Sequence, residues 1–158
     1  MPDDSSRRQG RARTTAPRNT TALLGTAYMS LGHRIVAGVN AAGFPQRPAH
    51  SAVMAHIEID GGTRLTTIAA RANITPQAVG ELVDDLERMG YLERQPDPDD
   101  RRAKRIVLTW RGRECVAVAI ETIAAVEAEL DALLGSAGLA HLHQVLNQIV
   151  TASRKTVP

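Results

Sequence analysis

The densest group of charged residues in the chain is the stretch DPDDRRAKRIVLT, from Asp97 to Thr109. Three aspartates are followed by four basic residues and then by an apolar run of strand character. Arginine and lysine bind phosphate groups, and arginine also enters a narrow, A·T-rich minor groove of DNA. Taken alone, the stretch is equally compatible with a solvated turn whose charges neutralise each other.

Positive charge is concentrated around this stretch. Residues 94–113 carry a net charge of +4, whereas residues 114–150 contain five acids and no lysine or arginine. The seven bases of the first segment are Arg94, Arg101, Arg102, Lys104, Arg105, Arg111 and Arg113. Such an asymmetry orients a protein on a polyanion. Ordering a loop arginine costs side-chain entropy, and Asp100 is placed to hold the loop and aim Arg102.

Two short helices are predicted directly before the charged loop. Leu65, Ile68 and Ala69 share one face of the first helix. The apolar residues of the second helix are also spaced so that they share one face. Those positions are Val79, Leu82, Val83 and Leu86. The apolar spacing therefore predicts a tightly connected helix pair.

The turn between these helices has residues suited to each position. Asn73 tolerates a left-handed backbone, Thr75 is a good N-cap, and Pro76 suits the first position of a helix. Gly90 ends the second helix. YLERQ and RIVLT then read as two strands joined by the charged loop.

A helix pair followed by a hairpin is a winged helix-turn-helix. The predicted fold class is therefore mainly α with a small β-hairpin wing, flanked by N- and C-terminal dimerisation helices. A capped recognition helix fits the major groove, so its first turn, Thr75 to Ala78, is expected to face the base edges. Gln77 is able to contact adenine with two hydrogen bonds.

The chain divides into four predicted segments. Residues 1–18 form a disordered basic tail, 19–45 an N-terminal dimerisation helix, 46–113 the DNA-binding domain, and 114–158 the C-terminal dimerisation helices. A helix from Thr109 to Leu134 would be about 39 Å long, more than one small lobe covers. Its apolar stripe and that of Leu139–Ile149 therefore predict a homodimer.

The stretch LTTIAARANITPQAVGELVDDLERMGYLERQPDPDDRRAKRIVLTWRGRE resembles the DNA-binding half of a MarR-family transcriptional regulator. The resemblance is carried by the wing motif Asp97, Pro98, Arg102, Leu108, Thr109 and Gly112. It implies a triangular homodimer on a palindromic site, a recognition helix at residues 75–89, and Arg102 as the minor-groove arginine. Gly80 and Glu81 depart from the Thr-Arg pair of many members, and Glu81 is able to accept from cytosine N4.

The expected contacts with double-stranded DNA combine the recognition helix and the wing. They are Thr75, Pro76, Gln77, Ala78, Glu81, Arg94, Arg101, Arg102 and Lys104. The resemblance also implies repression relieved by a small aromatic or anionic effector between the dimer helices and the lobe. Tyr28, His33 and Arg34 are the candidate effector-binding residues, although the simpler interpretation is that they are polar positions on a dimer-facing helix.

Other chemistries are not expected. The single cysteine excludes an intrachain disulfide, and no apolar run approaches the roughly 20 residues that span a bilayer, so a cytoplasmic, nucleoid-associated protein is expected. No catalytic, metal-binding or cofactor-binding pattern is found in the sequence. Two alternatives stay open: a winged-helix protein-interaction module without DNA binding, and a thiol-based stress sensor using Cys115.

Overall fold

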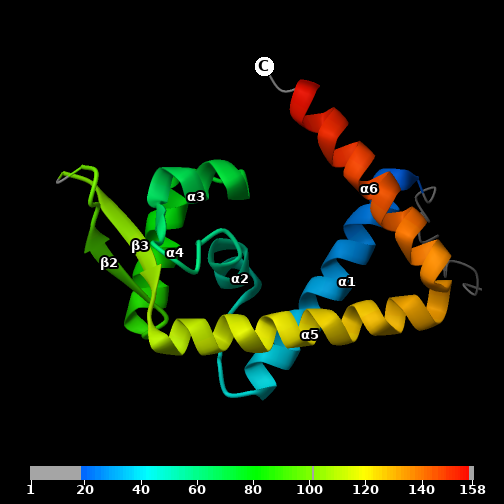
Figure 1. The fold of residues 1–158 in the computed structure, drawn as a ribbon, viewed down its shortest axis with the longest axis horizontal. Coiled ribbons are helices and arrows are strands. Elements are labelled where there is room, and N and C mark those ends of the chain that lie inside the picture. The colour runs from blue at the N-terminus through cyan, green and yellow to red at the C-terminus, as the bar shows by residue number, and fades with distance from the viewer. Residues whose placement is uncertain (1–18, 101, 157–158) are drawn as a thin grey trace, which may run out of the picture.

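The computed structural model describes residues 19–100 and 102–156. The predicted basic tail, residues 1–18, and Arg101 lie outside the described residues. The described chain is mainly helical with one small antiparallel sheet, as the sequence predicts (Figure 1). In chain order the elements are α1 (Thr20–Ala41), α2 (Pro48–Met54), β1 (Thr63–Arg64), α3 (Leu65–Ala72), α4 (Pro76–Arg88), β2 (Leu92–Pro96), β3 (Lys104–Leu108), α5 (Trp110–Leu134) and α6 (Ser136–Thr156).

The sheet contains one strand more than the hairpin expected from the sequence. Strands β2 and β3 pair in the register Leu92–Leu108 to Pro96–Lys104, and β1 pairs antiparallel with the other edge of β3. The short helix α2 ends at Met54 rather than continuing toward β1. Two consecutive glycines with positive φ, Gly61 and Gly62, turn the chain back instead, so that β1 reaches β3.

The predicted connection between α3 and α4 is confirmed. Asn73 is left-handed, with φ 55° and ψ 44°, and the Thr75 hydroxyl accepts from the backbone N–H of Ala78 at 3.2 Å. Pro76 is the first residue of α4, and Gly90 follows the helix with a φ of +77°. These residues fix the direction in which α4 leaves α3.

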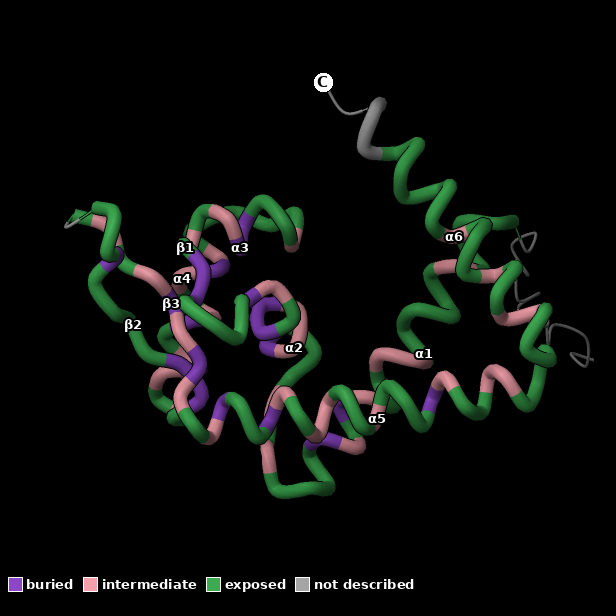
Figure 2. Tube along the Cα trace, viewed as in Figure 1, coloured by how far each residue is buried: buried purple, intermediate pink, exposed green. Residues whose placement is uncertain are grey.

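One hydrophobic core holds the lobe made by α2, α3, α4 and the sheet. Figure 2 shows that the buried residues gather there and thin out along α1, α5 and α6. The core consists of Val39, Val53, Met54, Ile57, Ile68, Ala69, Val79, Val83, Leu86, Tyr91, Leu92, Ile106, Leu108 and Cys115. Since Val39 lies on α1 and Cys115 on α5, the two long helices are rooted in the lobe.

The first turn of α5 is bound closely to the base of the wing. The Thr109 hydroxyl donates to the carbonyl of Gly90 at 2.6 Å and accepts from the N–H of Gly112 at 3.0 Å. A Cβ at Gly112 would lie 2.0 Å from the carbonyl oxygen of Tyr91, so only glycine permits this approach. From this root α5 runs away from the lobe and meets α1 and α6 (Figure 1).

Candidate nucleic-acid interface

Helix α4 presents a polar face opposite its buried face. Val79, Val83 and Leu86 are fully buried in the lobe, whereas Gln77 and Glu81 are exposed. The Gln77 amide donates to the Glu81 carboxylate at 3.4 Å, one helical turn away. One amide hydrogen and the carbonyl oxygen of Gln77 remain available, and these are the groups that pair with an adenine edge.

Thr75, Pro76 and Ala78 occupy the first turn of α4 as expected. Thr75 and Pro76 are exposed, and Ala78 is half-buried with its N–H bound to the Thr75 hydroxyl. Thr75 therefore serves first as a helix cap, and its carbonyl accepts from Val79 N–H at 3.1 Å. Of the four residues, Gln77 has the side chain best suited to reading a base edge.

Asp97 organises the wing, a role that the sequence favours for Asp100. The Asp97 carboxylate is buried and accepts from Arg64 Nε at 2.6 Å and from the N–H of Asp99 at 3.0 Å. Arg105 Nε lies 3.3 Å from the same carboxylate. Asp97 thus joins β1, the wing loop and β3.

The electrostatic environment of Asp97 favours its charged form. The hydrogen bond from Arg64, followed by that from Asp99 N–H, holds the pKa of the Asp97 carboxyl well below its ordinary range. The Asp97 carboxylate in turn raises the pKa of Arg64. The wing root is therefore an ion pair at neutral pH.

Asp100 shapes the loop through the backbone. Its carboxylate accepts from the N–H of Arg102 at 3.0 Å, and its carbonyl accepts from Ala103 N–H at 2.9 Å. Within the described residues, no carboxylate forms an ion pair with the side chain of Arg102 or Lys104, and both residues are exposed. Both are therefore free to meet phosphate.

Arg94 is placed differently from these two residues. Its guanidinium binds Asp84 at 2.8 Å and also binds Glu87, so it bridges β2 and α4. Arg101 lies outside the described residues. The structure thus brings Arg94 to α4, and leaves Arg102 and Lys104 on the wing.

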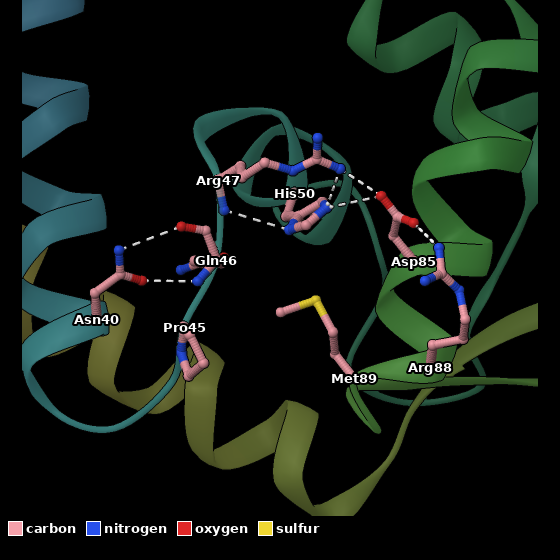
Figure 3. Close-up of a pocket in the computed structure, with 8 residues that line it drawn as sticks. All are labelled: Asn40, Pro45, Gln46, Arg47, His50, Asp85, Arg88 and Met89. Atoms are coloured by element: carbon pink, nitrogen blue, oxygen red, sulfur yellow. Dashed lines mark hydrogen bonds and ion pairs between the residues drawn. The ribbon is translucent and has the colours of Figure 1, made fainter.

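A pocket of about 420 Å³, open to solvent, lies where α1, α2 and α4 meet (Figure 3). Its lining residues are Asn40, Pro45, Gln46, Arg47, His50, Asp85, Arg88 and Met89. The Asn40 side chain accepts from Gln46 N–H at 2.7 Å and donates to Gln46 O at 3.2 Å, which fixes the connection from α1 to α2. Burial, and then the nearby Arg47 charge, lower the pKa of His50.

The candidate effector residues lie elsewhere, on α1. Tyr28 is 74% exposed, His33 is exposed, and Arg34 binds Glu129 of α5 at 2.5 Å. These three side chains do not line the pocket in Figure 3. Sequence reasoning missed Arg47, His50 and Asp85, because their contacts join residues 35 to 38 positions apart.

Further observations concern thiol chemistry, metal binding and membrane insertion, none of which the sequence favours. Cys115 is 1% exposed, and burial raises the pKa of its thiol. Across residues 19–100 and 102–156, no three His, Cys, Asp or Glu side chains are grouped as metal ligands. Likewise, no helix in that part of the chain is long and apolar enough to cross a membrane.

Comparison with known proteins points to one family. A family model described as the MarR family matches residues 46–103. No curated protein sequence matches the chain. Among solved structures, the transcriptional repressor CouR bound to a 23-mer DNA duplex is 27% identical, with 84% of this chain and 92% of that chain covered and a TM-score of 0.71.

Two more solved structures share the fold. CouR from Rhodococcus jostii RHA1 bound to p-coumaroyl-CoA is 22% identical, with 84% of this chain and 92% of that chain covered and a TM-score of 0.68. The MarR family transcription regulator SP03579 is 20% identical, with 87% and 89% covered and a TM-score of 0.68. The resemblance indicated by the wing motif is therefore confirmed: residues 46–103 match the MarR family, and the fold is that of MarR-family transcriptional regulators.

Proposed function

We propose that this protein is a sequence-specific DNA-binding transcriptional regulator. The observation that carries the proposal is a capped helix with Gln77 exposed, beside a wing where the side chains of Arg102 and Lys104 form no ion pair among the described residues. Gln77 supplies base readout, and the two wing cations supply phosphate or minor-groove contacts. The DNA complex of CouR supports this assignment, because that protein has the same fold.

The DNA-contacting set that we propose combines α4 and the wing. It comprises Thr75, Pro76, Gln77, Ala78 and Glu81 with Arg101, Arg102 and Lys104. Glu81 is proposed to hold the Gln77 amide as well as to face the bases, since the two side chains are hydrogen-bonded. Replacing Glu81 with alanine should then relax specificity at the base pair that Gln77 reads.

We also propose that the regulator acts as a homodimer and a repressor on a pseudo-palindromic operator in the nucleoid. Large apolar side chains are exposed along the helices outside the lobe. They are Leu23, Met29, Ile120, Ile123, Leu133, Leu134, Val145, Ile149 and Val150. A twofold partner would cover them and set two recognition helices about 34 Å apart, one turn of DNA.

Regulation by a small aromatic or anionic effector belongs to the same proposal. Its support is the p-coumaroyl-CoA complex of CouR, a protein of the same fold. Tyr28, His33 and Arg34 remain the candidate effector residues on α1. An effector that changed the spacing of the two lobes would lower the fit to both half-sites.

The decisive experiment is binding to the DNA upstream of the protein's own gene. Affinity should fall steeply and linearly in a plot of log affinity against log salt, and unrelated DNA should compete poorly. If that region is not bound, selection from random duplexes should yield a pseudo-palindrome. Weak binding that is equal for every sequence would contradict the proposal.

A further inference from the structure

Helix α4 carries a charge that opposes its proposed use. It has four acidic residues, Glu81, Asp84, Asp85 and Glu87, and one basic residue, Arg88. DNA is a polyanion, and an acidic helix in its groove is repelled. Proposed DNA recognition by this helix therefore requires that most of these carboxylates be neutralised from outside the helix.

The wing neutralises two of them through Arg94. One terminal nitrogen of the Arg94 guanidinium binds Asp84 at 2.8 Å, and the other binds Glu87. Arg94 lies on β2, which follows α4 directly in the chain. Since each terminal nitrogen of Arg94 binds a carboxylate, the positive charge of Arg94 is already compensated on α4 and contributes little to phosphate binding.

The connection between α1 and α2 neutralises the third through Arg47. Arg47 is the residue before α2, and its guanidinium binds the Asp85 carboxylate (Figure 3). The same guanidinium contacts buried His50 Nε2 at 3.1 Å, and Asp85 also binds Arg88. Arg47 thereby joins the start of α2 to α4.

These two groups of ion pairs, which we call the Arg94 clamp and the Arg47 clamp, lie on opposite sides of α4. Asp85 and Glu87 are two residues apart, so at 3.6 residues per turn they project about 200° apart around the helix axis. Val79, Val83 and Leu86 occupy the buried face between them. A rotation of α4 that moved Gln77 out of register would pull one carboxylate away from its arginine.

We infer that Arg94 and Arg47 are positioning residues for DNA recognition. They neutralise the acids of α4 and fix its rotation, so that Gln77 and Glu81 face the base edges. This inference rests on the proposed function, and it replaces the direct DNA contact expected of Arg94. It also explains how a helix with four acids serves a DNA-binding protein.

The test is a double-mutant cycle on DNA affinity with full-length protein and a selected operator duplex. Arg94→Gln is measured in the native background and in an Asp84→Asn/Glu87→Gln background. A positioning role predicts a loss of about tenfold or more in the native background and less than about twofold in the neutralised one. Arg47→Gln with Asp85→Asn forms the matching cycle for the second clamp.

Two readouts separate positioning from a phosphate contact and from a purely structural role. The preference for operator over unrelated DNA should fall with Arg94→Gln, because a rotated helix loses base contacts first. In the neutralised background, Arg94→Gln should leave the salt dependence unchanged, whereas a lost phosphate contact lowers its slope by about 0.9. Cooperative thermal unfolding verifies that each variant is folded.

Arg71→Gln is the matched control. It removes the same charge from an exposed ion pair, with Glu58 at 3.0 Å, that does not involve α4. Its effect on affinity should be the same in both backgrounds. Equal losses for Arg94→Gln in both backgrounds would overturn the inference alone, whereas the absence of any sequence-dependent binding by the native chain would overturn the proposed function and the inference with it.

Discussion

The side chains of Arg102 and Lys104 form no ion pair in the part of the chain that the structure describes, whereas those of their basic neighbours Arg94 and Arg105 do. A guanidinium already paired with carboxylates contributes little to phosphate binding, whereas an unpaired one attracts DNA at full strength. The number of arginines in the wing therefore overstates the positive charge that DNA meets.

Replacing Arg102 with alanine should weaken operator binding about ten- to a hundredfold without unfolding the protein. Its side chain is exposed, and the loop geometry depends on its backbone N–H, which alanine retains. Fluorescence anisotropy at matched salt measures the affinity, with circular dichroism as the check on folding. Unaltered affinity would remove Arg102 from the site.

Replacing Asp97 with asparagine should destabilise the protein at neutral pH, and the loss of stability should be smaller in acid. The folded-state pKa of Asp97 lies below the unfolded value of about 3.9, so its charge stabilises the fold above that pH. This stabilisation is lost as the pH falls through the folded-state pKa. The gap in Tm between native and variant protein should therefore narrow below about pH 4, and a constant gap from pH 7 into acid would contradict this role.

Peroxide should leave the DNA affinity unchanged. Cys115 is buried against the lobe, and burial disfavours the thiolate that reacts with peroxide. Native protein and Cys115→Ser should behave alike in anisotropy titrations before and after peroxide treatment. A response that the serine variant abolishes would restore the thiol-sensor alternative.

At the scale of the elements, two glycines in helices differ in the space available to a side chain. Gly112 lies against the Tyr91 carbonyl, and its Cβ would also meet Leu108 at 3.2 Å. At Gly80, in the middle of α4, a Cβ would point into open space. The same substitution therefore has different consequences at the two sites.

Gly112→Ala should destabilise the protein by about 1–3 kcal/mol, because the methyl group has to displace backbone. Gly80→Ala should stabilise it by up to about 1 kcal/mol through higher helix propensity. Urea denaturation with a common m-value measures both. Equal effects would show that the close contact at Gly112 does not hold α5 to the wing.

The elements that local sequence specifies were predictable, and those set by distant contacts were not. Asn73, Thr75 and Gly90 mark their turn by backbone preference and capping alone, and the structure confirms them. Strand β1 has two residues and no periodicity to reveal it. Arg64 and Asp97 are 33 positions apart, and Arg47 and Asp85 are 38 apart, so their pairing depends on the folded lobe.

At the scale of the whole molecule, the helices outside the lobe leave apolar surface uncovered. Leu133 is 77% exposed and Ile120 is 56% exposed, and α6 adds Val145, Ile149 and Val150. The sequence predicts that a second copy of the chain covers this stripe. The number of exposed apolar side chains on α5 and α6 in a single chain favours that prediction, because exposed apolar surface often marks an interface.

Removing residues 136–158 should abolish the homodimer. Light scattering should give about 34 kDa for the native protein, twice the 17.0 kDa chain, and a monomer for the truncated protein. Val145→Asp/Ile149→Asp in the full chain tests the same surface while keeping the helix, since both positions are exposed in the protomer. A dimer that survives both changes would place the interface elsewhere.

The contact between Gly112 and Tyr91 also determines how a displacement travels through the molecule. Because α5 is packed so closely at its root, we expect the wing to turn with α5, and the 25-residue helix would act as a lever arm about 38 Å long. A tilt of about 5° at the end near α6 would swing the wing by about 3 Å, roughly the rise of one base pair. A small change at the far end of α5 is thus enough to move the DNA-binding lobe out of register.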